Sequence, residues 1–572
     1  MSAKIIVLKF GSSILQKDDS VSHAVHEVYR YAREGYRVIA VVSAISGNTD
    51  RLAARLGSTE NLSRPDCAAY LLATGEQQAA ALLTMALERS GIDSGLLDPR
   101  EARLITEGDP LDAFPVSIDA PLINKRLKQQ GVLVIPGFIG LTKNGGTALL
   151  GRGGSDLSAL FIAKAVNAER CRLLKDVDGI YERDPADAAP ARRFAKLHWR
   201  DALAVSGCLI QRKALQFAEK HALPFEVAQP VNNYETAVGD HPPAFADRPE
   251  VRPLKVALLG LGTVGFGVYR YLQKHTDKYD ISAIAVRDKQ KHADKNIPPH
   301  LLVDDPWKAI LTPCDIVIET IGGEAPAAEL ISAALERGRS VVTANKAVIA
   351  NSGANLQSIA NANGAQLRYS ASVGGGVPVL ETLHRYAKHG IRRFDGVING
   401  TCNFVLDRFA EGDGWGDAVA AAQSAGFAEA NPGTDLQGLD ALHKLKIITK
   451  EGFGEELSED DIRCEGITGL YPASVKLFTA RNHCIRLIAS CRKTKTGLKT
   501  VIAPRLLKKD LFLANTGGEA NRAYIETQDG EVIRLTGKGA GRWPTAEAVM
   551  ADLFDIYRLK LNRPPIRRDA VA

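Results

Sequence analysis

The sequence has no hydrophobic stretch long enough to cross a membrane and no block of like charge. It contains no run of about 18 apolar residues, so we expect no transmembrane helix. The 72 basic and 66 acidic residues are spread along the chain and leave a net charge of +6, which gives no argument for binding nucleic acid or an anionic membrane. A strand is predicted from Ile5, which leaves no room for a signal or transit peptide.

The sequence also lacks the cysteine pairs that zinc sites and disulfide frameworks use. Its eight cysteines are scattered, without a C-x-x-C pair, so we expect reduced thiols, no structural zinc and a cytoplasmic location. Hydrophobic residues make up 45% and charged residues 24% of the chain, as in ordinary globular proteins with sizeable cores. The length of 572 residues predicts roughly three to four domains.

The first 230 residues alternate strand-like and helix-like segments. Buried strands are predicted from Ile5 and at residues 38–42, 132–136 and 172–174, and a helix is predicted from Leu157. Strands that alternate with helices form a largely parallel sheet, so we predict an α/β fold for this half of the chain.

Small-residue turns lie where ligands bind in such a sheet, beyond the carboxyl ends of its strands. Gly11-Ser12-Ser13 and Gly153-Gly154 offer backbone N–H groups to phosphate oxygens, and Lys9 adds a positive charge. The sequence has no G-x-x-x-x-G-K-[ST] loop, so a P-loop enzyme is excluded. Each turn alone is as compatible with a structural role, but together they favour phosphate binding.

These residues resemble motifs of the amino-acid kinase family and, within it, of aspartokinases. The matching segments are Lys9–Ser13 (K-F-G-S-S), Ser43-Ala44, Thr49-Asp50, Thr74-Gly75-Glu76, residues 151–156 (G-R-G-G-S-D) and residues 176–179 (D-V-D-G). The resemblance covers about 230 residues and implies a three-layer αβα domain that transfers the γ-phosphoryl group of Mg-ATP to the side chain of aspartate.

The resemblance also implies residue roles. Lys9 and Asp156 would act in phosphoryl transfer, and Thr49, Glu76 and Arg152 would hold aspartate. The residues that would lie beside the nucleotide are Gly11, Ser12, Asp176 and Tyr181.

Three departures from the family pattern affect the ATP side. Lys175 replaces a threonine before D-V-D-G, Ala186 replaces an arginine after Asp184-Pro185, and Leu209 stands at a lysine position in residues 207–213. Two positive charges expected near the ATP phosphates are therefore missing. Either Lys175 and Lys213 compensate for them, or ATP binding is weak or lost.

Residues 231–253 are punctuated by proline and asparagine and are predicted to be a linker. Aspartokinases commonly carry paired ligand-sensing βαββαβ modules after the kinase domain, and this stretch is too short for them. We therefore expect no feedback control through such modules.

The second half opens with a dinucleotide-binding fingerprint. A buried strand at 256–259 is followed by Gly260, Gly262 and Gly265 in G-x-G-x-x-G spacing, with Thr263 and Val264 between the last two, and then by helix-like residues. In this context the first glycine permits the turn, the second lets a pyrophosphate approach, and the third lets helix pack on strand. The alternative is a glycine-rich turn without a ligand.

The next predicted strand, 281–286, ends in charged residues that bear on cofactor choice. Arg287 and the lysines after it suit the 2′-phosphate of NADP, whereas Asp288 keeps NAD possible by binding a ribose 2′-hydroxyl. A solvated charged turn is the alternative without a ligand. Further strands at 315–320 and 340–343 place Thr320, Asn345 and Lys346 at the strand ends that face the nicotinamide.

Acidic residues and lysines gather again after residue 395. Residues 396–404 are predicted to form a strand and a polar turn, and Glu429 and Asp435 are predicted to lie in an ordered loop before a helix. On that helix Asp440 and Lys444 are spaced i,i+4 and share a face. From the spacing alone a surface salt bridge is the better explanation. Three carboxylates and a lysine that converge after a cofactor domain favour a site instead, because they could bind an ammonium and a hydroxyl group while a lysine moves a proton.

The second half resembles homoserine dehydrogenase over about residues 254–560. The matching segments are residues 260–265, 343–346 (T-A-N-K), 372–378 (S-V-G-G-G-V-P), 399–404, 426–444 and 539–546. The resemblance implies hydride transfer between NADP or NAD and the pair homoserine and aspartate 4-semialdehyde.

Residue roles follow from the resemblance here too. Lys346 and Lys444 would be the acid/base pair, with pKa values lowered by burial, and Glu429, Asp435 and Asp440 would hold the substrate. The backbone carbonyls of Val373, Gly375 and Val377 would bind a sodium or potassium ion. Asn431 and Gln437 stand where acidic residues are frequent in the family.

Together the two resemblances imply a fused enzyme of threonine and methionine synthesis. The expected domains are an amino-acid-kinase-like αβα domain (1–230), a linker (231–253), a Rossmann domain (254–394, completed by 536–572) and an α+β catalytic and dimerisation domain (395–535), in a homodimer or higher homo-oligomer. Two alternatives remain open. One is a dehydrogenase whose first half is only a binding or assembly module, and the other is a kinase for another small carboxylate.

Overall fold

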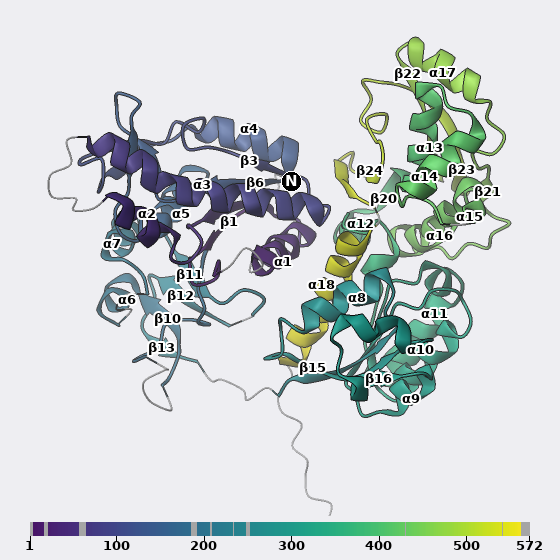
Figure 1. Ribbon diagram of the computed structural model, residues 1–572, viewed down its shortest axis with the longest axis horizontal. Helices are drawn as coiled ribbons and strands as arrows, with labels where there is room; N and C mark the ends of the chain where they lie inside the picture. Colours follow the sequence, from purple (N-terminus) through teal and green to yellow (C-terminus); the bar gives the residue numbers. More distant parts are fainter. Residues whose placement is uncertain are drawn as a thin grey trace, which may run out of the picture. The chain divides into compact units, whose positions relative to one another are not determined.

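The computed structural model describes residues 4–561 except 17–20, 57–63, 185–190, 206, 208, 233, 247–251, 430 and 540. The chain forms two compact units (Figure 1). The N-terminal unit contains Met1–Arg89 and Asp93–Glu250, and the C-terminal unit contains Ser90–Ile92 and Val251–Ala572. No helix of the described residues combines the length and the apolarity needed to cross a bilayer.

The N-terminal unit is built on a nine-stranded sheet of order β13-β10-β12-β11-β9-β1-β2-β6-β3. Its central strands β9, β1, β2 and β6 are parallel and buried on both faces, which explains their continuous apolar sequences. The strands are β1 (Ile5–Phe10), β2 (Arg37–Val42), β3 (Ser94–Leu96), β6 (Val132–Pro136), β9 (Arg170–Leu174), β10 (Phe194–His198), β11 (Phe225–Ala228), β12 (Glu235–Gly239) and β13 (Ala244–Phe245).

A second, four-stranded sheet has the order β5-β4-β7-β8, with β4 (Ile105–Glu107), β5 (Phe114–Ser117), β7 (Ile139–Leu141) and β8 (Thr147–Leu149). The helices of this unit are α1 (Val21–Arg33), α2 (Asn48–Leu56), α3 (Pro65–Arg89), α4 (Ala120–Gln130), α5 (Gly154–Ala165), α6 (Trp199–Val205) and α7 (Arg212–Lys220). Leu157 and Leu160 of α5 pack in one apolar core with Val7, Ile39 and Val41 of the central strands. The predicted α/β fold of this half is confirmed.

Two expectations for this unit were wrong. Residues 231–253 are not only a linker, because β12 and β13 lie within them and extend the sheet. Helix α5 begins at Gly154 rather than at Leu157, because Gly153 takes a left-handed conformation (φ +72°) that ends the preceding turn.

The C-terminal unit begins with a Rossmann-type sheet of six parallel strands in the order β16-β15-β14-β17-β18-β19. The chain reverses its direction of winding between β14 and β17, which leaves a ligand crevice at their carboxyl ends. The strands are β14 (Leu254–Leu259), β15 (Tyr279–Ala285), β16 (Leu302–Val303), β17 (Ile316–Glu319), β18 (Ser340–Thr343) and β19 (Leu367–Arg368).

The helices around this sheet are α8 (Thr263–Leu272), α9 (Pro306–Leu311), α10 (Ala327–Glu336), α11 (Lys346–Ala362) and the last helix, α18 (Arg542–Leu561), whereas α12 (Val379–Tyr386) packs on helix α16 (Leu439–Phe453). Although α18 is distant in sequence, it lies against α8 (Figure 1). Aromatic contacts of Tyr279 with Phe554 and Tyr557 join α18 to β15.

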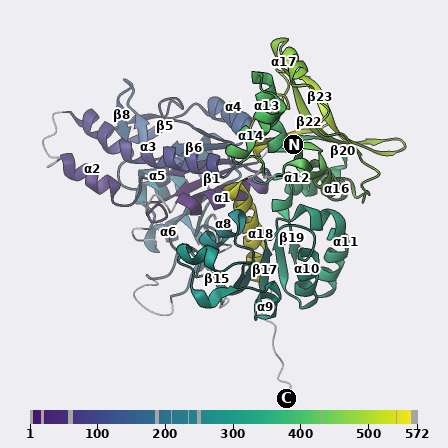
Figure 2. The same cartoon turned by 45° about the vertical axis from the view of Figure 1, so that its right-hand side comes forward.

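A mixed six-stranded sheet follows, in the order β21-β23-β22-β20-β24-β25. Its strands are β20 (Ile391–Val397), β21 (Arg463–Cys464), β22 (His483–Thr494), β23 (Gly497–Lys508), β24 (Ala520–Thr527) and β25 (Val532–Lys538). Its helices are α13 (Gly400–Glu411), α14 (Trp415–Ser424), α15 (Gly433–Leu436), α16 (Leu439–Phe453) and α17 (Pro472–Ala480). Helices α13, α16 and α17 pack on β22 (Figure 2).

Two local predictions for this region need correction. The polar segment after β20 is not a turn but the start of α13, because Asn399 caps that helix by accepting a hydrogen bond from the backbone N–H of Cys402 (2.8 Å). Asp435 lies in the short helix α15 rather than in a loop.

Candidate active sites

The glycine turn between β14 and α8 has the geometry of a dinucleotide site. Gly260 has φ +96°, and a Cβ added there would lie 2.9 Å from the carbonyl oxygen of Thr320. A Cβ added at Gly265 would lie 2.2 Å from the carbonyl oxygen of Gly260, so both positions require glycine. At Gly262 a Cβ would have no described protein atom within 4 Å, and this open side is where a pyrophosphate can approach. Thr263 and Val264 form the first turn of α8 beside it.

A cavity of about 930 Å³, called here the cofactor cavity, opens over this turn. It is bordered by the ends of β14, β15 and β17, which contribute Gly260, Val286 and Thr320 among other residues. The Thr320 hydroxyl is 3.1 Å from the carbonyl oxygen of Gly260 and joins the two neighbouring strand ends. The predicted residues Gly260, Gly262, Thr263, Arg287 and Thr320 therefore meet at one cavity.

The charged residues of the cofactor cavity are mostly basic. Arg287, Lys291, Lys295 and Arg542 line it, together with two aspartates. The Asp288 side chain accepts a hydrogen bond from the backbone N–H of Gln290 (2.9 Å).

Lys295 and Arg542 had not been predicted as site residues. Lys295 ends the 3-10 helix η3 (Gln290–Lys295) and lies over the ring of Phe266, 4.9 Å from its centroid. Arg542 begins α18, and its only sequence signal was its place in the closing G-A-G-R-W motif.

A buried glutamate that had also escaped prediction organises the loop after β17. Glu319 accepts hydrogen bonds from the backbone N–H groups of Ile321 (2.8 Å) and Gly322 (3.1 Å), and the Thr343 hydroxyl donates to its other oxygen. Asn345 caps α11 and donates to the carbonyl oxygen of Gly323 (2.6 Å). This network fixes the start of α11, whose first residue is Lys346.

Lys346, Asp440 and Lys444 form a compact charged cluster, called here the C-terminal cluster. The Lys346 ammonium lies 2.8 Å from Oδ1 of Asp440, and Lys444 donates to Oδ2 of Asp440 (2.7 Å) and to the carbonyl oxygen of Ile398 (2.7 Å). Asp440 and Lys444 share a face of α16, as their spacing predicted, and both are buried. The alternative of a surface salt bridge is therefore wrong.

The pKa values in this cluster follow from its charges and burial. Burial alone would raise the pKa of Asp440, but Lys444 and Lys346 outweigh it and hold that pKa well below its usual range. Asp440 raises the pKa of Lys346, against the lowering that burial would produce. The expected lowering of the Lys346 pKa is thus wrong. Burial and the charge of Asp440 raise the pKa of Asp435.

Asn399, quoted in the sequence motif but not predicted as a site residue, joins the two aspartates. Its Nδ2 donates to Asp435 (2.8 Å) and to Asp440 (2.9 Å), and the Thr401 hydroxyl lies 3.2 Å from the other oxygen of Asp435. Glu429 is exposed at the edge of this group, near enough for its charge to contribute to the raised pKa of Lys346.

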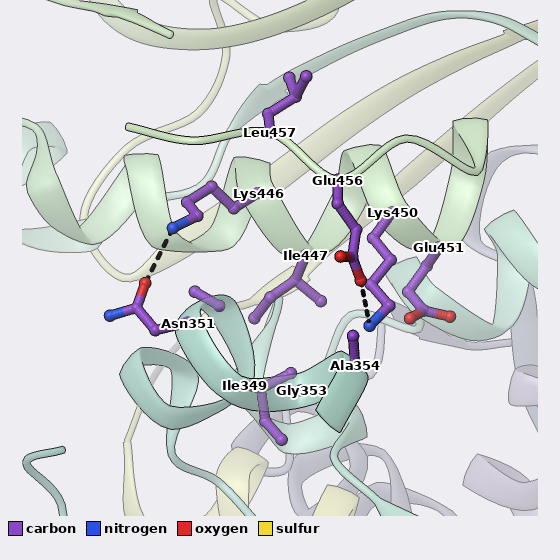
Figure 3. Close-up of a pocket in the computed structure, with 11 residues that line it drawn as sticks. Ile349, Asn351, Gly353, Ala354, Lys446, Ile447, Lys450, Glu451, Glu456 and Leu457 are labelled. Carbon is purple, nitrogen blue, oxygen red and sulfur yellow. Dashed lines mark hydrogen bonds and ion pairs between the residues drawn. The ribbon is translucent and has the colours of Figure 1, made fainter. Parts of the chain in front are cut away.

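Helices α11 and α16 also meet away from the charged cluster, around a small cavity of about 150 Å³ (Figure 3). Lys446 of α16 donates to Asn351 of α11 (2.8 Å), and Lys450 pairs with Glu456 (2.9 Å). Ile447 points from α16 toward α11 between these two polar pairs. These contacts keep the two lysine-bearing helices in register.

The turn expected to bind a monovalent cation is tightly folded. Gly374 and Gly375 have positive φ values (+85° and +58°), and Val377 donates its N–H to the carbonyl oxygen of Gly374 (3.0 Å). The carbonyl oxygen of Val377 accepts a hydrogen bond from the N–H of Val379 (2.8 Å), and Val373 begins the turn as a buried residue.

The N-terminal unit has a second charged cluster, at the carboxyl ends of β1 and β9, called here the N-terminal cluster. Asp156, in the first turn of α5, lies 2.8 Å from the Lys9 ammonium through Oδ1 and accepts a hydrogen bond from Lys175 (2.9 Å) through Oδ2. Burial and the charge of Lys175 lower the pKa of Lys9 to about 8, although Asp156 opposes this shift. A Cβ at Gly11 would lie 3.1 Å from the Lys9 ammonium, so the turn leaves room for that charge.

Glu76 of α3 is a buried carboxylate whose pKa burial raises to about 7. Its Oε1 accepts a hydrogen bond from the backbone N–H of Ala44 (3.1 Å), while Oε2 has no hydrogen-bond partner among the described residues. The hydroxyl groups of Ser43 and Ser155 are hydrogen-bonded (2.7 Å), which ties the end of β2 to the first turn of α5, where Asp156 lies.

The other predicted residues of this unit lie at its periphery. Thr49 is in the first turn of α2 and half-buried, whereas Arg152, Ser12 and Asp176 are exposed. The Tyr181 hydroxyl donates to Asp178 (2.6 Å) within its own loop.

Comparison with known proteins identifies both units. The family model for homoserine dehydrogenase matches residues 378–554, the model for the NAD-binding domain of homoserine dehydrogenase matches residues 260–370, and the amino acid kinase family model matches residues 4–228. The NAD-binding match and the cofactor cavity agree on a nicotinamide cofactor.

Individual relatives agree with these models. The chain is 35% identical over 331 residues to homoserine dehydrogenase of Pseudomonas aeruginosa, covering 55% of this chain and 75% of that enzyme. It is 35% identical over 317 residues to the Synechocystis enzyme, covering 53% and 73%. The crystal structure of a homoserine dehydrogenase from Thiobacillus denitrificans superposes with a TM-score of 0.52 at 33% identity, covering 55% of this chain and 76% of that chain. The chain therefore belongs to the homoserine dehydrogenase family and carries an amino acid kinase domain at residues 4–228.

Proposed function

We propose that this chain is a bifunctional enzyme that interconverts homoserine and aspartate 4-semialdehyde with NADP and phosphorylates aspartate with Mg-ATP. The C-terminal cluster is the observation that supports the residue roles proposed for the dehydrogenase. Its two ammonium groups and Asp440 meet at the start of α11, one strand beyond the cofactor crevice. The nicotinamide supplies hydride acceptance and donation, and the residues of this chain bind the substrate and move its proton.

In this mechanism Asp435 and Glu429 hold the ammonium group of homoserine, because they are the carboxylates at the accessible side of the cluster. Lys346 and Lys444 act as the acid/base pair. During oxidation the hydroxyl proton of homoserine passes to a lysine as the C4 hydride leaves, and a carbonyl group forms; reduction runs in reverse. Asp440 and the carbonyl oxygen of Ile398 orient Lys444, while Lys346 remains 40% exposed and can reach the substrate oxygen.

NADP is the proposed cofactor because Arg287, Lys291 and Lys295 line one cavity and can pair with a 2′-phosphate. Asp288 is engaged with the backbone of its own turn, which disfavours its use as a ribose ligand. Initial rates with NADPH and NADH test this assignment. Arg287→Ala should raise KM for NADPH by about 10- to 100-fold, the cost of one charge-assisted bond, and leave KM for NADH nearly unchanged. Equal effects on the two cofactors would refute the assignment.

The kinase proposal is supported by the unpartnered oxygen of Glu76 and by the N-terminal cluster. A buried carboxylate with a free oxygen suits the ammonium group of an amino-acid substrate, and the neighbouring lysines suit a phosphoryl group. ADP release from Mg-ATP with aspartate, in the full-length chain, tests it directly. Turnover only with another small carboxylate would replace aspartate as substrate. No turnover, alongside normal homoserine oxidation, would leave a binding or assembly module.

A bound sodium or potassium ion is proposed at the turn of Val373, Gly375 and Val377, because backbone carbonyl oxygens are the hard ligands that such ions take and Gly374 and Gly375 fold the turn tightly with positive φ values. Dehydrogenase rates in sodium, potassium or tetramethylammonium salts at equal ionic strength test this. Equal rates in all three would remove the ion from the proposal.

We also propose that the chain forms a homodimer through the sheet region 395–535. Leu506 on β23 and Val532 on the edge strand β25 are exposed apolar residues of that sheet. Light scattering on the full-length chain tests this, and a monomer at micromolar concentration would refute it.

A further inference from the structure

The N-terminal cluster contains more positive than negative charge. Lys9 and Lys175 both pair with Asp156, and the three side chains are 5%, 10% and 3% exposed. Within the described part of the chain, Asp156 is the acidic partner of both lysines. Glu76 is near enough for the charge of Lys9 to act on it but does not pair with either lysine, and burial raises its pKa to about 7, so the cluster keeps an excess of positive charge at neutral pH. A buried charge is costly unless it is paired, so the cluster favours an anion.

The donors of the two lysines are also incompletely used. Each ammonium group has three N–H donors, and the interactions of Lys9 and Lys175 in the described structure go to the two oxygens of Asp156. The remaining donors can bind the oxygens of a ligand. Asp156 holds one ammonium group with each of its two oxygens, so it fixes their positions without neutralising the pair.

The cluster lies among backbone turns that suit phosphate. Lys9 is paired with Leu173 in the register of β1 and β9, so Lys175 follows the neighbouring strand end at nearly the same height. Gly11 lies beside the Lys9 ammonium, and Gly153 and Gly154 lead into the first turn of α5, which carries Asp156. These features match a phosphoryl group better than a carboxylate, because a phosphoryl group offers three oxygens to several donors.

Lys213, the other basic residue that could supply this charge, is engaged elsewhere. Its ammonium lies 2.5 Å from Asp112 Oδ1 and 4.3 Å from the centroid of the Phe114 ring. Its charge is therefore neutralised by a carboxylate that is not shared.

We propose that Lys175 is the second phosphoryl-binding cation of the kinase site, acting with Lys9 from the opposite side of Asp156. The proposal rests on the proposed kinase function and assigns a catalytic residue to it. In the reaction a carboxylate oxygen of the amino-acid substrate forms a bond to the γ-phosphorus of Mg-ATP. The bond from that phosphorus to the β,γ-bridging oxygen breaks, and its electron pair leaves with ADP. No proton is transferred. The Lys9 and Lys175 ammonium groups stabilise the charge on the transferred and leaving oxygens.

Lys175→Met in the full-length chain removes the charge and keeps the apolar stem, and Lys213→Met is the matched control. The kinase kcat of Lys175→Met should fall by about 10²- to 10³-fold, as when one preorganised donor is lost, while KM for aspartate changes less than about threefold. Lys175→Arg should keep part of the activity because it keeps the charge. Homoserine oxidation by the same preparations should stay at the wild-type rate, which shows that the chain is folded.

Calorimetric binding of Mg-ATP and Mg-ADP separates this proposal from the kinase function. Lys175→Met should weaken Mg-ATP binding at least about tenfold and Mg-ADP binding much less, a difference that a purely structural lysine would not produce. This difference would support the role of Lys175 even if the wild-type chain showed no turnover with aspartate. A Lys175→Met variant with more than a third of the wild-type kcat, equal losses for ATP and ADP, or a wild-type chain that binds no ATP would overturn the proposal.

Discussion

Both units of this chain place one buried aspartate between two lysines, but the pKa of a lysine is lowered in one cluster and raised in the other. In the N-terminal cluster burial dominates and lowers the pKa of Lys9 to about 8, whereas in the C-terminal cluster Asp440 dominates and raises the pKa of Lys346. The side chain of Lys9 is 5% exposed and that of Lys346 is 40% exposed. The two shifts are opposite because desolvation outweighs Asp156 at Lys9, whereas at Lys346 the charge of Asp440, aided by Asp435 and Glu429, outweighs desolvation.

The difference matches the two chemistries. A desolvated pair of ammonium groups with excess positive charge is suited to bind a polyanion that restores the missing countercharge. A solvent-accessible lysine beside a fixed carboxylate can exchange its proton with a substrate oxygen and then with water. Each proposed role can be tested by altering one member of its cluster while the other cluster serves as the internal control.

The largest effect is expected from Lys444→Ala. It removes an ammonium that donates to both Asp440 and Ile398 and should lower kcat for homoserine oxidation by about 10³-fold, within the range typical of a lost acid/base group. Kinase turnover and the circular dichroism spectrum should not change. Surviving oxidation would show that Lys346 alone carries the proton.

The corresponding change in the N-terminal cluster, Asp156→Asn, should reduce the kinase activity alone. Asp156 raises the pKa of Lys9, so its loss lowers that pKa further below about 8 and leaves less of the charged form at neutral pH. We expect kcat for ADP release to fall about 10²-fold and homoserine oxidation to remain normal. If the two activities fell together, the variant would instead report a folding defect.

The two activities should also depend on pH in opposite directions. Lys9 binds phosphate only when protonated, so kcat/KM for ATP should decline about tenfold per pH unit above the Lys9 pKa of about 8. Oxidation of homoserine needs a neutral lysine, and because the pKa of Lys346 is raised, its rate should continue to rise over the same interval. Asp440→Asn should move that rise to lower pH. If the two reactions had the same pH dependence, the opposite pKa shifts of Lys9 and Lys346 would be contradicted.

The smallest effect is expected on stability, from Glu76→Gln. The folded state keeps the Glu76 proton between the unfolded-state pKa of 4.5 and the folded-state pKa of about 7. Stability therefore falls as pH rises through this window, by at most about 3 kcal/mol. The glutamine variant should be more stable than wild type at pH 8 and similar at pH 4, as measured by urea unfolding of the full-length chain. A difference at pH 4 equal to that at pH 8 would exclude this cause.

The sequence was most informative where one physical constraint acts alone. Strand β18 was predicted with its observed bounds because a buried parallel strand reads as a continuous apolar run. The i,i+4 spacing of Asp440 and Lys444 correctly predicted that they share a helix face, because helix periodicity depends only on the local sequence.

Local sequence patterns were less informative where tertiary contacts decide which secondary structure a segment forms. The proline-rich stretch before residue 253 reads as a linker, yet β12 finds partners in β10 and β11 and joins the sheet. Asn399 reads as a turn residue because asparagine favours both turns and helix caps, and only the following apolar face of α13 separates the two.

The charge state of the sites was the least predictable property. A sequence shows that Lys346 and Asp440 exist but not that their charged atoms lie 2.8 Å apart, and this distance reverses the expected pKa shift. Likewise, the sequence left Lys175 and Lys213 as equal candidates to replace a missing charge. Their partners Asp156 and Asp112 come from distant segments and distinguish them.

The place of Lys346 in its helix has a further consequence. Lys346 is the first residue of α11, a helix of 17 residues with no acidic residue in its first turn. The N-terminus of a helix carries a partial positive charge, which opposes a cation there. The helix backbone therefore favours the neutral form of Lys346, whereas Asp440 favours the protonated form. During reduction, the field of α11 therefore favours delivery of the proton from Lys346 to the substrate oxygen.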